Sequence, residues 1–210
     1  MKKAFALFVL IVTPTMAFAQ GTVVFNNQTG LVRQWTSPMD TTLVASLEGY
    51  AMVELISAPF GTPLVNPLPN FSTLASFLAA NPGWAVGTAL PGGSNPGGLA
   101  APGIFANGNL SLNVPGGASA EYFVISWTGP FQGPLDGATT YDAAEAIGNC
   151  WIRQSAIFTT ATGDPTTTPA GLPVNIRDTF GGVIMGTHEP TTSALAGLGL
   201  AALLVSRWRR

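Results

Sequence analysis

The side chains of this sequence that could do chemistry are mostly carboxylates. Asp142 and Glu145 form the closest pair of note, and two carboxyl groups can cleave a glycosidic bond when one is protonated and the other is ionised. Their spacing is also that of a capping box, in which Asp142 accepts a hydrogen bond from the backbone N–H of Glu145 and Glu145 reaches back. We favour the capping box, because it explains both acids without catalysis.

Four further acids stand singly beside strand-like segments, where a solvent-facing position is the default expectation: Glu48, Glu54, Glu121 and Asp178. Scattered aspartates and loop carbonyls could hold calcium, but the sequence has no Asp-x-Asp-x-Asp spacing. Removal of metal ions should therefore leave the fold and its stability unchanged. We predict no metal site and no cofactor.

Other kinds of catalytic site lack their residues. The only histidine is His188, near the end of the chain, so the preceding part cannot form a Ser-His-Asp or Cys-His site. The span 20–189 has no lysine, which excludes a glycine loop that holds phosphate with a following lysine. Cys150 is alone, so its thiol is either a small buried apolar group or a partner for an intermolecular disulfide. We expect no catalytic residue and a protein that is not an enzyme.

Aromatic side chains are the remaining candidates for binding, because the apolar face of a sugar ring matches an indole ring. The candidate glycan contacts are Trp35, Trp84 and Trp151. Trp127 and Tyr122 have opposite parity in one strand-like segment, so at most one of them should face outward. Packing in a core is the alternative for each tryptophan. Stacking on an exposed tryptophan would make exopolysaccharide the ligand.

The composition favours strands and turns as the elements that position these residues. Twenty-five glycines and 17 prolines in 210 residues argue against a helical bundle. Hydrophobic residues make up 47% and charged residues only 9%, which argues against disorder driven by charge. The chain is long enough for one domain of ordinary size with a sizeable core.

Alternating apolar residues give the clearest strand signals. Leu110, Leu112 and Val114 should share one face of a half-buried strand. The aromatic and β-branched segment 121–128 is typical of a central strand, and Pro115-Gly116-Gly117 predicts a hairpin between the two. Shorter strands are expected at 22–26, 31–35, 51–57, 152–160, 174–177 and 182–185. Many short strands separated by glycine and proline predict a mainly β fold, an antiparallel β-sandwich.

Two short helices and two loops complete the expected body. Asn70 could cap a helix over 71–80 that ends at Asn81-Pro82-Gly83, and a shorter helix should begin near Asp142. The glycine- and proline-rich segment 91–103 is expected to be a long loop without helix or strand, either mobile or functional. A second loop, rich in threonine and proline, is expected over 159–173.

The N-terminal residues have the pattern of a secretory signal peptide. Lys2 and Lys3 precede nine uninterrupted apolar residues, 4–12, and small side chains follow at Ala17 and Ala19. The alternative is a buried first helix of the domain, which leaves the position of the only two lysines unexplained. We predict a signal helix over 1–19 that signal peptidase removes, so that the mature chain begins with the next residue, Gln20.

The C-terminal residues predict a short hydrophobic helix. Residues 193–206 carry no charge, and three arginines stand among the last four residues, 207–210. At 1.5 Å per residue these 14 uncharged residues span about 21 Å, less than the hydrocarbon core of about 30 Å. The segment is thus a marginal transmembrane helix whose arginines stay in the cytoplasm while the body lies outside. A C-terminal core helix is the alternative.

A motif before this helix carries a family resemblance. His188-Glu189-Pro190-Thr191-Thr192, the Leu/Gly/Ala helix and the basic end resemble, in order, the three parts of the PEP-CTERM tail that exosortases recognise in Gram-negative bacteria. His188 stands where that family usually has its first proline. The resemblance implies that Glu189 and Pro190 form a sorting motif for an exosortase-type membrane protease. It also implies sorting to the cell envelope or the extracellular matrix, with the catalysis belonging to the sortase.

These observations divide the chain into a signal peptide (1–19), a β-sandwich domain (20–187) and a PEP-CTERM-like sorting tail (188–210). The span 20–189 has three arginines, no lysine and all ten acids, a net charge of −7 that excludes a nucleic-acid footprint. We expect an exported surface or extracellular-matrix protein without a catalytic role. The alternatives are a carbohydrate-binding module that retains exopolysaccharide and, less favoured, a glycan-cleaving enzyme.

Overall fold

The computed structural model describes residues 20–35, 42–68, 71–128, 138–147 and 150–185. This part of the chain is mainly β, with two short helices, as the sequence predicts. The signal peptidase residues Ala17 and Ala19 and the sorting residues Glu189 and Pro190 lie outside the described residues. Within those residues, no helix combines the length and the apolar character needed to cross a membrane.

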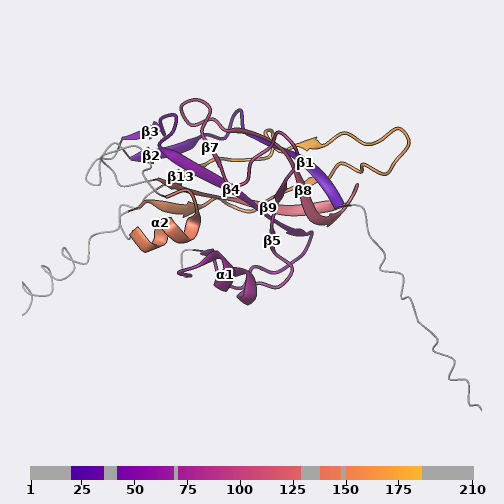
Figure 1. Ribbon diagram of the computed structural model, residues 1–210, viewed down its shortest axis with the longest axis horizontal. Helices are drawn as coiled ribbons and strands as arrows, with labels where there is room; N and C mark the ends of the chain where they lie inside the picture. Colours follow the sequence, from indigo (N-terminus) through magenta and orange to yellow (C-terminus); the bar gives the residue numbers. More distant parts are fainter. Residues whose placement is uncertain (1–19, 36–41, 69–70, 129–137, 148–149, 186–210) are drawn as a thin grey trace, which may run out of the picture.

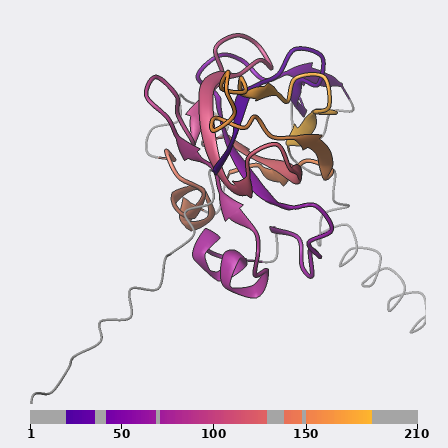
Figure 2. The same ribbon diagram turned by 90° about the vertical axis from the view of Figure 1, so that its right-hand side faces the viewer.

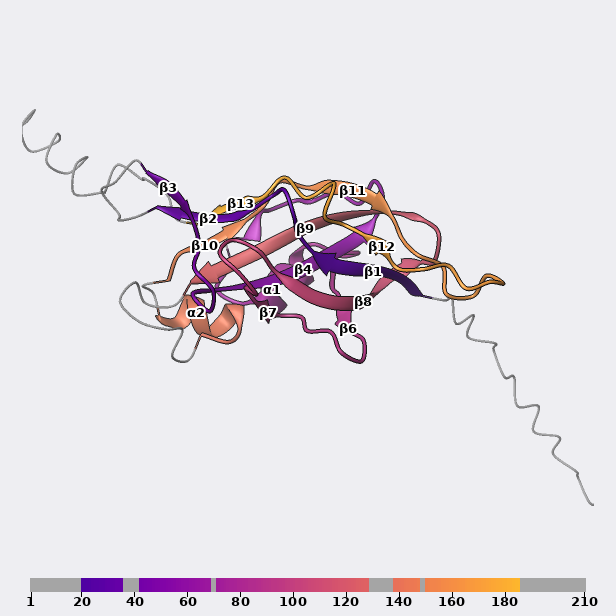
Figure 3. The same cartoon turned by 90° about the horizontal axis from the view of Figure 1, so that it is seen from above.

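One sheet has the strand order β12-β1-β8-β6. Its long strands, β1 (Gln20–Asn26) and β8 (Ala106–Pro115), are antiparallel, and two-residue strands flank them, β12 (Val174–Asn175) and β6 (Thr88–Ala89) (Figure 3). Leu110, Leu112 and Val114 are at most 3% exposed, whereas Asn113 between them is exposed. The predicted alternation along β8 is therefore confirmed.

A larger sheet is built on β4 (Ala51–Pro59) and β9 (Ser119–Thr128), which pair antiparallel along their full common length. β10 (Ile152–Gln154) and β11 (Phe158–Ala161) extend it beside β9, while β5 (Ala85–Val86) and β7 (Gly97–Gly98) pair with β4. Tyr122 and Trp127 point to opposite faces of β9, and both are 0% exposed. The expectation that at most one of them faces outward holds, and neither does, because both faces of this central strand are covered.

A third, smaller sheet has the order β13-β2-β3. β2 (Val32–Trp35) is antiparallel to β3 (Leu43–Ala45) and parallel to β13 (Val183–Met185). β12 is likewise parallel to β1. The expectation of a purely antiparallel fold is therefore corrected. Both parallel partners come from the last described segment, which returns beside the first strands after the long crossover that parallel pairing requires.

Two hydrophobic cores lie on the two faces of the β4–β9 pair. The first core takes residues from β1 and β8 on one side and from β4 and β9 on the other, for example Phe25, Leu110, Leu55 and Val124. The second core is closed by α1 (Leu74–Ala80) and α2 (Tyr141–Ile147). Figures 1 and 2 show both helices on the same side of the central strands.

The predicted hairpin between β8 and β9 is wrong. The two strands belong to different sheets, and the turn at Pro115-Gly116-Gly117 carries the chain from one sheet to the other. The Ala118 N–H donates to the Pro115 carbonyl over 3.2 Å, and Gly117 has φ 74°, which glycine adopts without strain. Apolar side chains of both strands belong to the first core, so β8 and β9 contact each other's surroundings through side chains and are not paired through backbone hydrogen bonds.

Helix α1 starts later than predicted. Its N-cap is Thr73, whose hydroxyl oxygen accepts the Ser76 N–H over 3.1 Å, while Asn70 lies outside the described residues. The preceding Phe71 N–H bonds to the Leu68 carbonyl in a separate turn, which is why the helix does not reach back to residue 71. The predicted end is confirmed, because Asn81 is the C-cap.

The segment 91–103 contains a short strand that the sequence did not predict. Gly97 and Gly98 form β7, opposite Val53 and Met52 of β4. Just before it, the Asn95 side chain accepts the Leu55 N–H over 2.8 Å and donates to the Leu55 carbonyl over 3.1 Å. The amide of Asn95 thus replaces a strand neighbour at the edge of β4. The segment is attached to the sheet along part of its length.

The predicted strand 152–160 is divided in two. β10 and β11 both pair with β9, and the break lies at Ser155. The Ser155 hydroxyl oxygen accepts the Val124 N–H over 3.0 Å, and the Ser155 N–H donates to the Val124 carbonyl over 2.8 Å. The hydroxyl takes the place of a backbone acceptor, so the ladder is interrupted at that point. β11 also occupies the start of the loop predicted over 159–173.

Candidate functional site

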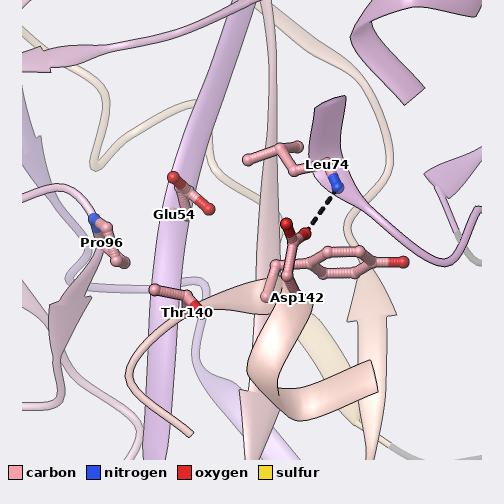
Figure 4. A pocket seen from close by; sticks show the side chains of 6 residues that line it. Glu54, Leu74, Pro96, Thr140 and Asp142 are labelled. Atoms are coloured by element: carbon pink, nitrogen blue, oxygen red, sulfur yellow. Dashed lines mark hydrogen bonds between the residues drawn. The ribbon is translucent and has the colours of Figure 1, made fainter. Parts of the chain in front are cut away.

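A pocket of about 220 Å³ lies between β4 and the first turns of the two helices. Its lining residues come from four segments of the chain: Glu54, Leu74, Pro96, Thr140, Tyr141 and Asp142. We call it the Glu54 pocket. In Figure 4 the carboxyl groups of Glu54 and Asp142 face each other from β4 and α2. The pocket therefore brings together two acids that are 88 positions apart in the sequence.

Glu54 forms the buried part of this pocket. It lies in β4 on the face of the second core, between Met52 and Ile56, and is only 5% exposed. β5 pairs with β4 at Ile56 and β7 pairs at Met52, so Glu54 stands opposite the gap between these two short strands. The expectation that Glu54 faces solvent is wrong, because a helix layer covers this face of the sheet.

Asp142 lies at the exposed rim of the pocket, in the first turn of α2. Its Oδ1 accepts the backbone N–H of Leu74 over 2.7 Å, at the start of α1. The N-terminal cap of α2 comes instead from Thr140, whose Oγ1 accepts the Ala143 N–H over 3.2 Å. The predicted capping box is therefore wrong in its partners. Asp142 has a structural role, but it ties one helix to the other.

Glu145 has a different partner from the one predicted. Its Oε1 lies 2.9 Å from the hydroxyl of Tyr141, one helical turn earlier. The same hydroxyl lies 2.6 Å from the Phe71 carbonyl, in the segment before α1. Burial, with the hydrogen bond and charge of Glu145 and the charge of Asp142, raises the pKa of Tyr141 above its usual value. Glu145 thus supports the wall of the pocket but does not line it.

The carboxyl group of Glu54 has no hydrogen-bond partner among the described residues. Burial, with a smaller contribution from the negative charge of Asp142, raises its pKa from 4.5 to about 7. Near neutral pH the group therefore exists in both forms, a hydrogen-bond donor when protonated and an anion when ionised. Such a group can exchange a proton or bind a cation.

The three candidate tryptophans belong to different segments, and two of them lie on opposite faces of the larger sheet. Trp84 is 4% exposed in the second core, where its indole N–H donates to the Pro63 carbonyl over 3.2 Å. Its ring therefore has no open face on which a sugar could stack. Trp151 is partly buried against the first core, on the opposite face of the sheet, and Trp35 is partly exposed in β2. The structure does not gather these three rings into one platform.

Cys150 is packed against the second core and is partly buried. Burial, with a contribution from the charge of Glu145, raises the pKa of its thiol. A less acidic thiol is a weaker nucleophile and metal ligand at neutral pH. Among the residues that the structure describes, no three histidine, cysteine, aspartate or glutamate side chains are grouped as a metal ion would need.

Searches for similar proteins give no match to this chain among protein-family models, curated proteins or solved structures. The Glu54 pocket must therefore be interpreted from its own residues. One sequence signal could have identified Glu54. It stands in the run Ala51 to Ala58, where apolar residues occupy both odd and even positions on either side of it. Such a run is typical of a strand that is covered on both faces. An acid in that run should be expected in a buried position.

Proposed function

We propose that this protein is an exported surface or extracellular-matrix protein, sorted to the cell envelope and without a catalytic role. The observation that carries the proposal is the pattern of residues on either side of the predicted domain. Before Gln20, a basic start and the apolar run 4–12 lead to small side chains at Ala17 and Ala19, and after residue 187 the Glu189-Pro190 motif is followed by an uncharged segment and a basic end. These two predicted address segments support the export and sorting of the part between them.

In this proposal signal peptidase removes 1–19, and the C-terminal hydrophobic helix anchors the exported chain in the inner membrane. An exosortase-type protease then acts at Glu189-Pro190, and the body moves to the cell surface or matrix. A net charge of −7 over 20–189 gives no support for a nucleic-acid partner. Exopolysaccharide is the expected neighbour of such a protein.

We further propose that the fold is a β-sandwich. Two sheets would face each other across the first core, one containing β1 and β8 and the other β4 and β9. Support comes from the first core, which joins Phe25 and Leu110 of one sheet with Leu55 and Val124 of the other. A packed interface between the inner faces of two sheets is the defining feature of this architecture.

Cleavage of a glycan is a second candidate function, and one observation favours it. The Glu54 pocket contains an acid with a raised pKa beside a second carboxyl group, the arrangement that separates acid and base roles in glycosidases. Asp142 already accepts the Leu74 N–H, which accounts for its position without catalysis. Release of reducing ends from exopolysaccharide, abolished by Glu54→Gln and retained by Glu48→Gln, would establish this function.

Export is tested by fractionation and N-terminal sequencing of the protein from a Gram-negative host that has an exosortase. We expect a mature chain beginning at Gln20 in the envelope or the medium. A second strain without the exosortase should retain the protein at the inner membrane. Cytoplasmic protein that begins at Met1 would contradict the proposal, and so would the same location in both strains.

A further inference from the structure

We propose that the Glu54 pocket binds a small organic cation, with its ammonium group held between the carboxyl groups of Glu54 and Asp142. This inference is independent of where the protein is sorted. It concerns a ligand of the folded body, and the pocket that would hold it is about 220 Å³ in volume.

The first argument is the unpartnered carboxyl group. Glu54 is 5% exposed, lines the pocket, and receives no hydrogen bond from any described residue. Buried carboxylates are normally paired or hydrogen-bonded, because desolvation without a partner costs free energy. An ammonium group supplies both a positive charge and three N–H donors. A ligand of this kind would satisfy the group that the fold leaves without a partner.

The second argument is the charge around the pocket. Asp142 and Tyr141 of α2 are the titratable residues that line it with Glu54, and Glu145 stands behind the Tyr141 hydroxyl. No basic residue lines it, and α1 contains no charged residue. Two carboxyl groups without a described counter-charge repel each other. A cation between them removes that repulsion, whereas an anion would increase it.

The third argument is the apolar part of the wall. Leu74 and Pro96 contribute aliphatic side chains to the lining (Figure 4), and the aromatic residue Tyr141 also lines the pocket. Calcium takes six to eight oxygen ligands, which such a wall does not supply. Aliphatic and aromatic groups instead suit the carbon chain of an alkylammonium ion. The pocket is also smaller than the range of about 300–1,000 Å³ that drug-sized ligands occupy, so the ligand should be small.

The protonation of Glu54 makes the proposed binding dependent on pH. Only the ionised carboxyl group attracts a cation, and its pKa is about 7. The ionised fraction is roughly 90% at pH 8 and about 3% at pH 5.5. Affinity should therefore fall on the order of 30-fold between pH 8 and pH 5.5, and a ligand should release protons from Glu54 when it binds at neutral pH.

The test is a calorimetric titration of the exported protein with butylammonium chloride at pH 8 and pH 5.5, at constant ionic strength. We expect saturable binding in the millimolar range at pH 8 and the large loss of affinity at pH 5.5. Glu54→Gln should abolish binding at pH 8. The matched control, Glu48→Gln, makes the same change at an exposed position and should bind like the wild type.

Two further probes identify the chemistry of the ligand. 1-Butanol has nearly the same shape as butylammonium without the charge, and calcium chloride has the charge without the carbon chain. Equal binding of 1-butanol, saturable binding of calcium alone, or binding of a neutral oligosaccharide in its place would overturn the proposal. Absence of butylammonium binding to the wild type at pH 8 would also overturn it, whether or not the Glu54→Gln variant folds. None of these outcomes bears on export.

Discussion

The two faces of the β4–β9 pair are covered in different ways. One face shares the first core with the strands β1 and β8, and the buried side chains that β4 and β9 contribute to it are mainly apolar. The buried polar side chains on this face of β4 and β9 are uncharged: Ser57, Ser126 and Thr128. The other face is covered by two helices of seven residues each and by loop segments. Only on this second face does an acid, Glu54, lie among the buried side chains of β4.

The difference shows how this fold makes room for a pocket. A long strand presents side chains at every second residue, so β1 and β8 can cover the facing strands without a gap. Short helices meet a sheet only along one stripe, and space remains where their first turns converge. Asp142 bridges that convergence through the Leu74 N–H. The strand-covered face should therefore carry stability, and the helix-covered face should tolerate change.

The largest expected effect comes from a matched pair of leucine substitutions on the two faces. Leu55→Ala removes a side chain that is 0% exposed in the first core and should lower the free energy of unfolding by about 3 kcal/mol or more. Leu74→Ala removes the same atoms from the half-buried pocket wall and should cost about 1 kcal/mol or less. Denaturant unfolding measures both. Equal losses would contradict the proposed division between the faces.

The next prediction concerns Glu54 and pH. The folded-state pKa of about 7 lies above the usual 4.5, so the folded state binds the proton more tightly than the unfolded state. The contribution of Glu54 to the free energy of unfolding should therefore be most favourable below pH 4.5. It should fall by up to about 3 kcal/mol as the pH rises to 7. Glu54→Gln should remove this loss and be more stable than the wild type at pH 8.

The measurement is denaturant unfolding at several pH values, with Glu48→Gln as the control for an exposed glutamate. The control should keep the pH dependence of the wild type. If Glu54→Gln is instead less stable at pH 8, the ionised Glu54 carboxylate must have a stabilising partner that the described residues do not contain.

A smaller effect is expected at the edge of β4 on the pocket side. Asn95→Ala removes the side chain that bonds both backbone groups of Leu55 and also the Gly87 carbonyl, over 2.7 Å. Loss of these bonds should lower the free energy of unfolding by about 2 kcal/mol. Asn113→Ala, on the exposed side of β8, is the control and should change stability by less than about 0.5 kcal/mol. Similar values for both variants would mean that the 91–103 segment does not hold the sheet edge.

The sequence could predict the local features of the strands but not how the strands are paired. Leu110, Leu112 and Val114 were predictable, because alternation is a local pattern that one covered face imposes on a strand. The partner of a strand is not local. The turn after Pro115 is compatible with a hairpin or with a change of sheet, and packing in the first core selects the latter.

The pocket was harder to predict than the strands, for the same physical reason. Asp142 and Glu145 have capping-box spacing, but a carboxylate bonds whichever N–H group is nearest in the folded chain, and for Asp142 this is Leu74 of the other helix. Glu54 could be recognised as buried only from the apolar residues that occupy both the odd and the even positions of β4. Its proximity to Asp142 depends on how α2 packs against the sheet. This packing cannot be predicted from a local sequence pattern.

The smallest expected effect on stability, and the one that separates the two causes of the raised pKa, is that of Asp142→Asn. The asparagine oxygen can still accept the Leu74 N–H, so the link between the helices should survive. Removal of the charge should lower the pKa of Glu54 only in part, because burial is the larger cause. A carbon-detected NMR titration of the Glu54 carboxyl group would measure this, and Asp178→Asn, at an exposed position, is the control. If the pKa of Glu54 returned fully to its ordinary value, the charge of Asp142 would be the main cause of the shift. Burial under the helices would then not be what sets this face of the sheet apart from the other.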